Sequence, residues 1–235
     1  MENIDYYNQE NKRYSQKRYP GEMIDYLHFF FRKRLELAKK FLKQIAKNKD
    51  NLLEIGCADG IVALEINDEF KNVFNQIVGI DNAPKMIEAA LSNKAISPNV
   101  KFFLRDDWKT DMSYDIILEI GVFNFTDMVQ ELDFVRKTLK SRGYYICSVA
   151  SKKSLKNYLR REDKDFKNFL TFKQYEKEFS KHFKIIDRYP YGLFVPYLWK
   201  FPAIGQKFQP IFERMFAVIL PNIFHEKIFL LKLKD

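Results

Sequence analysis

The sequence has few of the residues that mark several protein classes. It contains only two cysteines among 235 residues, Cys57 and Cys147, too few for the disulfide framework of a small secreted domain. Both lie in apolar runs, so we expect buried free thiols and a cytoplasmic protein. The N-terminus has no apolar signal core. The run 215–220 before Pro221 is far shorter than the roughly 20 residues of a membrane-spanning helix.

Charge is unevenly distributed along the chain. The formal net charge is +9, but residues 1–50 carry +5, residues 51–150 carry −5 and residues 151–235 carry +9. This asymmetry indicates a neutral or cationic ligand for the middle of the chain and an anionic partner for the flanks. The alternative is that the lysines only solvate helix faces. The basic residues are dispersed and no RNA-binding module is recognisable, which disfavours a nucleic-acid partner.

Short apolar runs alternate with amphipathic stretches. Strands are predicted at 52–55, 76–81, 100–104, 114–120, 144–150, 183–192 and 227–234, and helices at 24–47, 60–70, 83–94, 127–141 (closed by Gly143) and 171–183. Short, almost wholly apolar strands are typical of a parallel sheet covered on both faces. The alternation predicts a doubly wound, mostly parallel α/β sheet of seven strands.

No repeat or low-complexity linker divides the chain, so we expect one domain over 1–235. Its predicted parts are an N-terminal lid and helix (1–47), a core (48–150) and C-terminal elements on the substrate side (151–235). An aromatic and proline-rich insertion, 193–224, precedes the last strand.

The stretch NLLEIGCADG, residues 51–60, is where the sequence first indicates chemistry. An apolar strand ends in a turn that reads Gly-x-Ala-x-Gly, and Glu54 stands two positions before Gly56. In a doubly wound sheet ligands bind beyond the carboxyl ends of the strands, where glycines let the backbone approach them. Glu54 suits an ammonium group or a water network near a cationic ligand better than a pyrophosphate. A tight strand-to-helix connection without a ligand is the alternative.

Three ordered motifs resemble those of the class I S-adenosylmethionine-dependent methyltransferases. LLEIGCADG resembles the first, with Ala58 in place of the middle glycine and Gly60 as the last; VGIDNAPKMIEAA resembles the second, and VKFFLRDDW the third. YDIILEIGVFNF resembles the fourth strand and the loop that faces the methyl donor. The resemblance implies S-adenosylmethionine as cofactor and an antiparallel last strand.

The resemblance assigns roles to individual residues. It implies that Asp81 binds both ribose hydroxyls and that Asn82 and Met86 touch the adenine. Asp106 or Asp107 would accept from the adenine amino group, and Trp108 would pack on the ring. For each of these residues a structural role is the alternative: a helix N-cap for Asp81, turn chemistry for the aspartate pair, and core packing for Met86 and Trp108.

The residues that act on the acceptor are harder to find. Methyl transfer from a sulfonium requires positioning and exclusion of water, whereas a general base is optional. His225 and Glu119 are candidate catalytic residues, and Glu119 could instead contact the donor's amino group. Tyr14 and Tyr19 are candidate lid residues over the donor, and no metal site is predicted. Neither cysteine is placed to act as a nucleophile.

The sequence therefore predicts a methyltransferase acting on an oxygen or nitrogen atom of a small, anionic acceptor such as a nucleotide-sugar, a glycolipid or a metabolite. An RNA methyltransferase, a non-catalytic scaffold and, more remotely, a nicotinamide oxidoreductase are the alternatives. The insertion 193–224 suits a buried lid, a homodimer contact or an interfacial membrane-binding surface.

Overall fold

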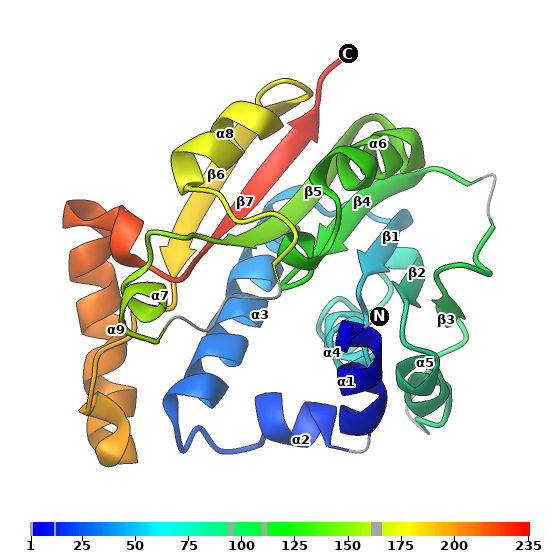
Figure 1. Ribbon diagram of the computed structural model, residues 1–235. Coiled ribbons are helices and arrows are strands. Elements are labelled where there is room, and N and C mark those ends of the chain that lie inside the picture. Colours follow the sequence, from blue (N-terminus) through cyan, green and yellow to red (C-terminus); the bar gives the residue numbers. More distant parts are fainter. Residues whose placement is uncertain (1, 12, 94–95, 110–111, 161–165) are drawn as a thin grey trace.

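A computed structural model describes residues 2–11, 13–93, 96–109, 112–160 and 166–235 (Figure 1). It contains one seven-stranded sheet in the order β3-β2-β1-β4-β5-β7-β6. The strands are β1 (Asp50–Ile55), β2 (Phe74–Asp81), β3 (Val100–Leu104), β4 (Tyr114–Glu119), β5 (Leu139–Ala150), β6 (Phe183–Tyr191) and β7 (Glu226–Leu233). Strands β1 to β5 pair in parallel, and β7 runs antiparallel to both β5 and β6. The predicted fold class is confirmed.

Helices cover both faces of the sheet because neighbouring strand residues point to opposite sides. Leu52 packs in a core with α3 (Tyr26–Ile45), α4 (Ile61–Glu69) and α5 (Pro84–Leu91). Leu53 packs in a second core with α6 (Met128–Thr138) and α8 (Phe172–Phe179). Both faces are thus buried, as the continuous apolar runs of the strands require.

The predicted helix over 127–141 is wrong at its C-terminal end. Helix α6 ends at Thr138 and the chain passes directly into β5, with Leu139 already opposite Tyr114. The strand register shifts after this pair, and Arg142 adopts a left-handed backbone with φ 62°. Gly143 follows because a Cβ there would lie 2.9 Å from the Lys140 carbonyl oxygen. The glycine therefore belongs to an irregularity within β5 and does not close a helix.

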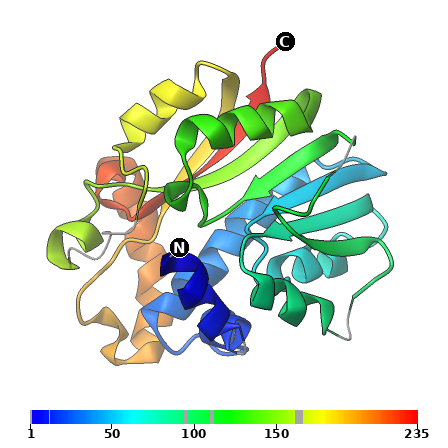
Figure 2. The same ribbon diagram turned by 45° about the vertical axis from the view of Figure 1, so that its right-hand side comes forward.

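The N-terminal segment forms two short helices, α1 (Glu2–Glu10) and α2 (Tyr14–Arg18), ahead of α3. In both views α1 lies near the carboxyl end of β1 (Figures 1 and 2). The backbone N–H and the hydroxyl of Ser15 donate to the carboxylate of Asp59, which ties α2 to the turn after β1. Asp25 caps α3 by accepting from the backbone N–H of His28.

The C-terminal third adds elements beside β6 and β7. Helix α7 (Leu155–Arg160) follows β5, and the insertion 193–224 contains a long helix, α9 (Pro202–Ile219), that the sequence reading did not predict. Glu213 of α9 accepts from the backbone N–H groups of Gly192 and Leu193, at 2.9 and 3.0 Å. Short 3-10 turns at Phe123–Phe125, Leu198–Lys200 and Pro221–Ile223 complete the described elements. Within the described residues, no helix combines the length and apolarity that crossing a membrane takes.

Gly79 tests the close approach of β2 to the turn after β1. A Cβ at this position would lie 2.7 Å from Phe102 Cδ1 and 2.8 Å from Cys57 Cβ. We expect Gly79→Ala to lower the free energy of unfolding by about 1–3 kcal/mol through overpacking, measured by urea denaturation. Gly21→Ala is the control, since a Cβ there meets nothing within 4 Å. Equal stability of the two variants would contradict the predicted tight packing.

Candidate functional site

The turn after β1 is built around positive backbone angles. Gly56, Ala58 and Gly60 have φ values of 73°, 49° and 81°. A Cβ on Gly56 would lie 2.2 Å from Val122 Cγ2, and one on Gly60 would lie 2.6 Å from Phe102 Cζ. Glycine is therefore required at positions 56 and 60, whereas Ala58 adopts a left-handed backbone conformation with its side chain in place. The backbone N–H groups of Gly56 and Cys57 both donate to the carbonyl of Ile80, which fixes the turn against β2.

Asp81 at the tip of β2 holds this turn from the other side. One carboxylate oxygen accepts from Ala58 N at 2.9 Å and the other from Ala83 N at 2.8 Å. Burial raises the pKa of Asp81, while these backbone donors lower it. A carboxylate has about four lone-pair positions, so each oxygen retains capacity for a further donor such as a ribose hydroxyl.

A cavity of about 530 Å³ opens beside Asp81. Gly56, Ala58, Asp81, Asn82 and Tyr14 are the predicted site residues that line it. Its remaining walls come from α1, from β1 and β2, from the segments that follow β2, β3 and β4, and from the segment before α8: Ile4, Tyr7, Ile55, Ile80, Ala83, Arg105, Ile120, Gly121, Val122, Phe125, Thr126 and Lys167. The cavity lies at the carboxyl ends of the parallel strands, as the fold requires of a ligand site.

Other predicted cofactor residues lie outside this lining. Asp106 and Asp107 are exposed on the turn after β3. Trp108 packs against Tyr114 and Phe134, with ring centroids 6.1 and 6.0 Å away. These three residues thus adopt the turn and core positions that stood as alternatives to adenine contacts.

Met86, Gly60 and Glu54 lie behind the cavity wall. Met86 is fully buried beneath Ala58 and Ala83. Glu54 is buried under the turn, and its Oε2 has no hydrogen-bond partner among the described residues. Burial raises the pKa of Glu54 well above its usual range, and the charge of Asp81 raises it further. Glu54 thus lies under the turn and does not line the cavity.

Tyr7 and Tyr14 pack over Ala58, Ala83 and Met86, a position that fits the lid expected of Tyr14. Tyr19 lies elsewhere, against Phe31 with ring centroids 5.8 Å apart. Burial raises the pKa of Tyr7 and of Tyr14, so both remain phenols. Sequence reasoning placed Tyr7 in the covering segment but did not assign it to the site.

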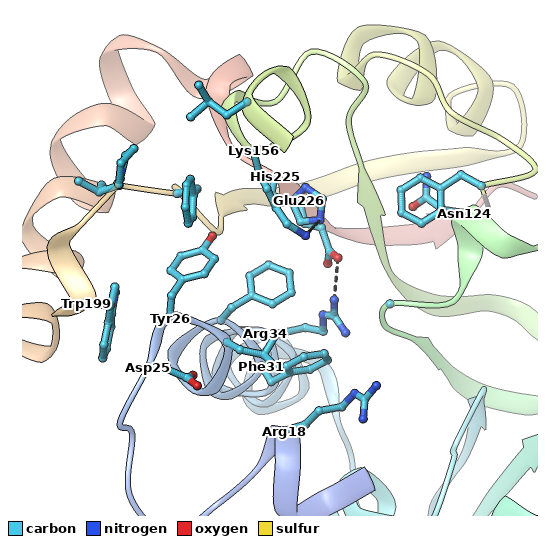
Figure 3. Close-up of a pocket in the computed structure, with 18 of the residues that line it drawn as sticks. Arg18, Asp25, Tyr26, Phe31, Arg34, Asn124, Lys156, Trp199, His225 and Glu226 are labelled. Atoms are coloured by element: carbon cyan, nitrogen blue, oxygen red, sulfur yellow. Dashed lines mark hydrogen bonds and ion pairs between the residues drawn. The ribbon is translucent and has the colours of Figure 1, made fainter. Parts of the chain in front are cut away.

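A second cavity, of about 1170 Å³, adjoins the first. Tyr7, Tyr14, Gly121 and Phe125 line both. Figure 3 shows the second cavity enclosed by α3, by the segment around Trp199 and by the start of β7. Aromatic side chains form much of its wall, and four cationic side chains line it together with two carboxylates: Arg18, Arg34, Lys156 and Lys200 with Asp25 and Glu226.

A buried ion pair forms the floor of this cavity. Arg34 Nη2 donates to Glu226 Oε1 at 2.6 Å (Figure 3). Arg34 Nε donates to the hydroxyl of Tyr191 at 3.1 Å, and that hydroxyl donates to Glu226. The Arg34 charge holds the pKa of Glu226 below its usual range despite burial. A Cβ on Gly121 would lie 2.1 Å from Arg34 Nη1, so the guanidinium lies directly at the junction of the two cavities.

Arg34 and Glu226 are site residues that sequence reasoning missed. A signal for Arg34 existed, because it lies three residues after Phe31 and four before Ala38 on the buried stripe of the predicted helix. A cation on such a stripe indicates a buried partner or a ligand. The partner itself, 192 residues away, could not be identified from the sequence.

The two candidate catalytic residues have different surroundings. His225 lines the second cavity, with Nε2 at 3.4 Å from Lys156 Nζ. Burial and the Lys156 charge lower the pKa of His225 to about 3, so the ring is neutral and weakly basic. Glu119 is fully buried, accepts from the hydroxyl of Tyr145 and lines neither cavity. The described residues contain no cluster of histidine, cysteine or acidic side chains that could hold a metal ion.

Comparison with known proteins adds independent findings. A family model described as a methyltransferase domain matches residues 16–189. A malonyl-[acyl-carrier protein] O-methyltransferase of Ilyobacter polytropus is 32% identical over 84 residues, which is 35% of this chain and 31% of the relative's length. The chain thus matches about a third of that curated relative.

Two solved structures have the same fold over the whole chain. The N-methyltransferase NodS of Bradyrhizobium japonicum, in complex with S-adenosyl-L-homocysteine, has a TM-score of 0.67 at 14% identity, covering 100% of this chain and 98% of the other. A chain from the complex of the Haloferax volcanii Trm112 methyltransferase activator with a methyltransferase also gives 0.67, at 15% identity, covering 100% and 97%.

Glu119 provides a test of how the buried carboxyls behave. Burial raises its pKa well above the ordinary 4.5, so the folded state binds this proton more tightly than the unfolded state does. The resulting stabilisation is fully present below about pH 4.5 and is lost as pH rises through the raised folded pKa. We expect Glu119→Gln, which stays neutral, to lose less unfolding free energy than the wild type between about pH 5 and pH 8.

Urea denaturation at several pH values measures this difference, and each unit of pKa elevation accounts for about 1.4 kcal/mol. Glu36→Gln, at an exposed position of α3, is the control and should reproduce the wild-type slope. If the Glu119→Gln slope also matched the wild type, Glu119 would ionise equally in both states.

Proposed function

Because this chain belongs to the class I S-adenosylmethionine-dependent methyltransferases, we propose that it methylates an oxygen or nitrogen atom of a small anionic acceptor with an apolar portion. The observation that carries the proposal is the second cavity, which adjoins the first at Tyr7, Tyr14, Gly121 and Phe125. One cavity takes the donor and the other takes the acceptor. Their shared residues surround the place where the methyl group is transferred.

The first cavity fits the donor's chemistry. Asp81 accepts the ribose hydroxyls with its remaining lone pairs, and Asn82 and Ala83 lie against the adenine. The methionine portion extends along Gly56 toward Tyr14. Arg34 Nη1 makes no hydrogen bond to the described residues and lies against Gly121, so it is suited to the donor's carboxylate. Arg18, whose guanidinium stacks 4.1 Å from the centre of the Tyr14 ring, supplies a second cation.

The second cavity fits an acceptor that is both apolar and anionic. Phe30, Phe31, Phe194 and Trp199 give it aromatic walls, which favour an apolar body over a highly hydrated one. The excess of cations over carboxylates among its lining residues favours a negative charge. Arg34 is bound to Glu226 and Arg18 stacks on Tyr14, so Lys156 and Lys200 are our candidates for the acceptor's charge.

The reacting atom follows from the absence of a strong base among the described lining residues. Tyr7 and Tyr14 stay protonated and His225 is weakly basic. The two carboxylates of the second cavity are already bound, Glu226 to Arg34 and Asp25 to the backbone N–H of His28. An acceptor atom that already has a free lone pair, such as a carboxylate oxygen or an unprotonated amine, needs no base. The names of the relatives, an O-methyltransferase and an N-methyltransferase, are compatible with either atom.

Within this proposal, the chain's own residues position the acceptor and exclude water, and they do not exchange protons. The lid tyrosines cover the donor and keep water from the sulfonium, while the aromatic walls align the acceptor for in-line attack. The donor supplies an activated methyl group when bound. The weak basicity of His225 in the second cavity is consistent with a methyl transfer that depends on the orientation of the acceptor and not on a base.

Asp81→Ala tests the donor site. We expect S-adenosylmethionine to raise the unfolding midpoint of the wild type, since a ligand at a hundred times its Kd stabilises a protein by about 2.7 kcal/mol. The variant should lose this shift, because each charge-assisted hydrogen bond to a ribose hydroxyl contributes roughly 1.5–3 kcal/mol. Thermal denaturation with and without the compound measures the effect.

Asp107→Ala is the matched control for this experiment, being an exposed aspartate at the next strand end. It should keep the full shift if the turn after β3 does not contact the donor. A full shift in Asp81→Ala would refute the proposed ribose contact. Incubation with labelled donor and a panel of carboxylates, amines and alcohols then identifies the acceptor class.

A further inference from the structure

The insertion exposes an unusual apolar surface on α9. Its side chains recur every three or four residues and therefore share one side of the helix. They are exposed by 40 to 84% at Ile204, Phe208, Ile211, Met215 and Val218. The opposite side of α9 packs on the protein through Gly205, Gln209 and Glu213, which are buried. We call the five exposed side chains the α9 stripe.

The exposed charged side chains of α9 and of the turn just before it are all cations. Lys207 and Arg214 lie on α9 itself and Lys200 lies just before it. The helix has a single acidic residue, Glu213, and its carboxylate is buried and bound to the backbone of Gly192 and Leu193. The exposed part of α9 thus combines apolar side chains with cations and presents no anion.

The combination of apolar side chains with cations favours one of two partners for the stripe, a second copy of the chain or a lipid surface. A second copy of the chain would bring its own Lys207 and Arg214 to the same seam, and like charges without counter-charges oppose such pairing. An anionic lipid surface offers what the stripe lacks, because it accepts apolar side chains into its acyl boundary and attracts Lys and Arg.

The α9 stripe is also continuous in sequence with the proposed acceptor cavity. Tyr197, Trp199 and Lys200, which line that cavity, immediately precede α9, and Tyr197 is 78% exposed. Tyrosine and tryptophan favour the boundary between water and lipid. At the outer edge of the molecule, α9 lies beyond β6 and away from β3 (Figure 1).

We propose that α9 binds the surface of an anionic membrane, with the α9 stripe in the acyl boundary and Lys200, Lys207 and Arg214 among the headgroups. Bound in this way, the enzyme would take an anionic, apolar acceptor directly from the bilayer. This second step depends on the proposed function, whereas the binding itself does not. Membrane contact would shorten the path of a poorly soluble acceptor to the cavity.

Vesicle co-flotation of the full chain tests the proposal. We expect the protein to float with vesicles of phosphatidylcholine and phosphatidylglycerol, and not with phosphatidylcholine alone. Raising the salt concentration should weaken binding, because screening reduces the attraction of cations to the surface. Equal flotation with both vesicle types, or none at low salt, would overturn it.

Variants locate the surface. Val218→Glu, in the stripe, and Lys207→Glu, beside it, should each weaken partitioning by about tenfold or more. Val129→Glu is the matched apolar control, since Val129 is 73% exposed on α6, and Lys173→Glu is the charge control on α8. If the control variants weakened partitioning as much as the α9 variants, α9 would not be the binding surface.

Two further measurements separate the outcomes. The thermal shift with S-adenosylmethionine should be the same in every variant as in the wild type, which shows that the variants keep the fold. Absence of the shift in the wild type would count against the proposed function and not against membrane binding. Light scattering should give a monomer mass at the concentration used for flotation. A dimer that dissociates in Val218→Glu would assign the α9 stripe to a second copy and overturn the membrane proposal.

Discussion

The buried pair of Arg34 and Glu226 joins the parts of the molecule that make the site. Arg34 lies on α3 and Glu226 is the first residue of β7, so one ion pair connects an early helix with the last strand. The guanidinium also touches Gly121 at the end of β4, where the two cavities meet. Removing either partner would leave an uncompensated buried charge, which typically costs about 3–5 kcal/mol. The geometry of both cavities therefore depends on this pair.

Such a pair is an expensive way to stabilise a fold, because burying two charges offsets much of their attraction. Its position offers a reason for its presence. Tyr191 and Glu226 use two of the three guanidinium nitrogens and leave Nη1 at the cavity junction. The ion pair thus holds a cation in a fixed orientation beside the proposed methyl-transfer site, where an exposed arginine would lose conformational entropy on binding.

The sheet and the turn after β1 could both be predicted from the sequence, because both depend on local patterns. The apolar runs specify strands, and the positive φ angles at Gly56 and Gly60 explain why glycine occurs there. Asp81 was predicted in the same way, as a carboxylate at a strand tip, and it lines the first cavity. The Arg34–Glu226 pair joins distant residues and has no local signature. Helix α9 was missed since its apolar side chains face outward, so its pattern did not indicate a core-facing helix.

The third motif shows where resemblance and local physics separate. Asp106, Asp107 and Trp108 match the family in order, yet Trp108 packs between Tyr114 and Phe134. Arg105 precedes Asp106 and lines the first cavity, while its guanidinium forms an ion pair with Glu131 at 2.9 Å. An aromatic residue after β3 can fill the second core or cover a ligand, and the apolar surface of α6 decides for the core. Motif order therefore locates the strand end, whereas the packing of α6 determines where the Trp108 ring lies.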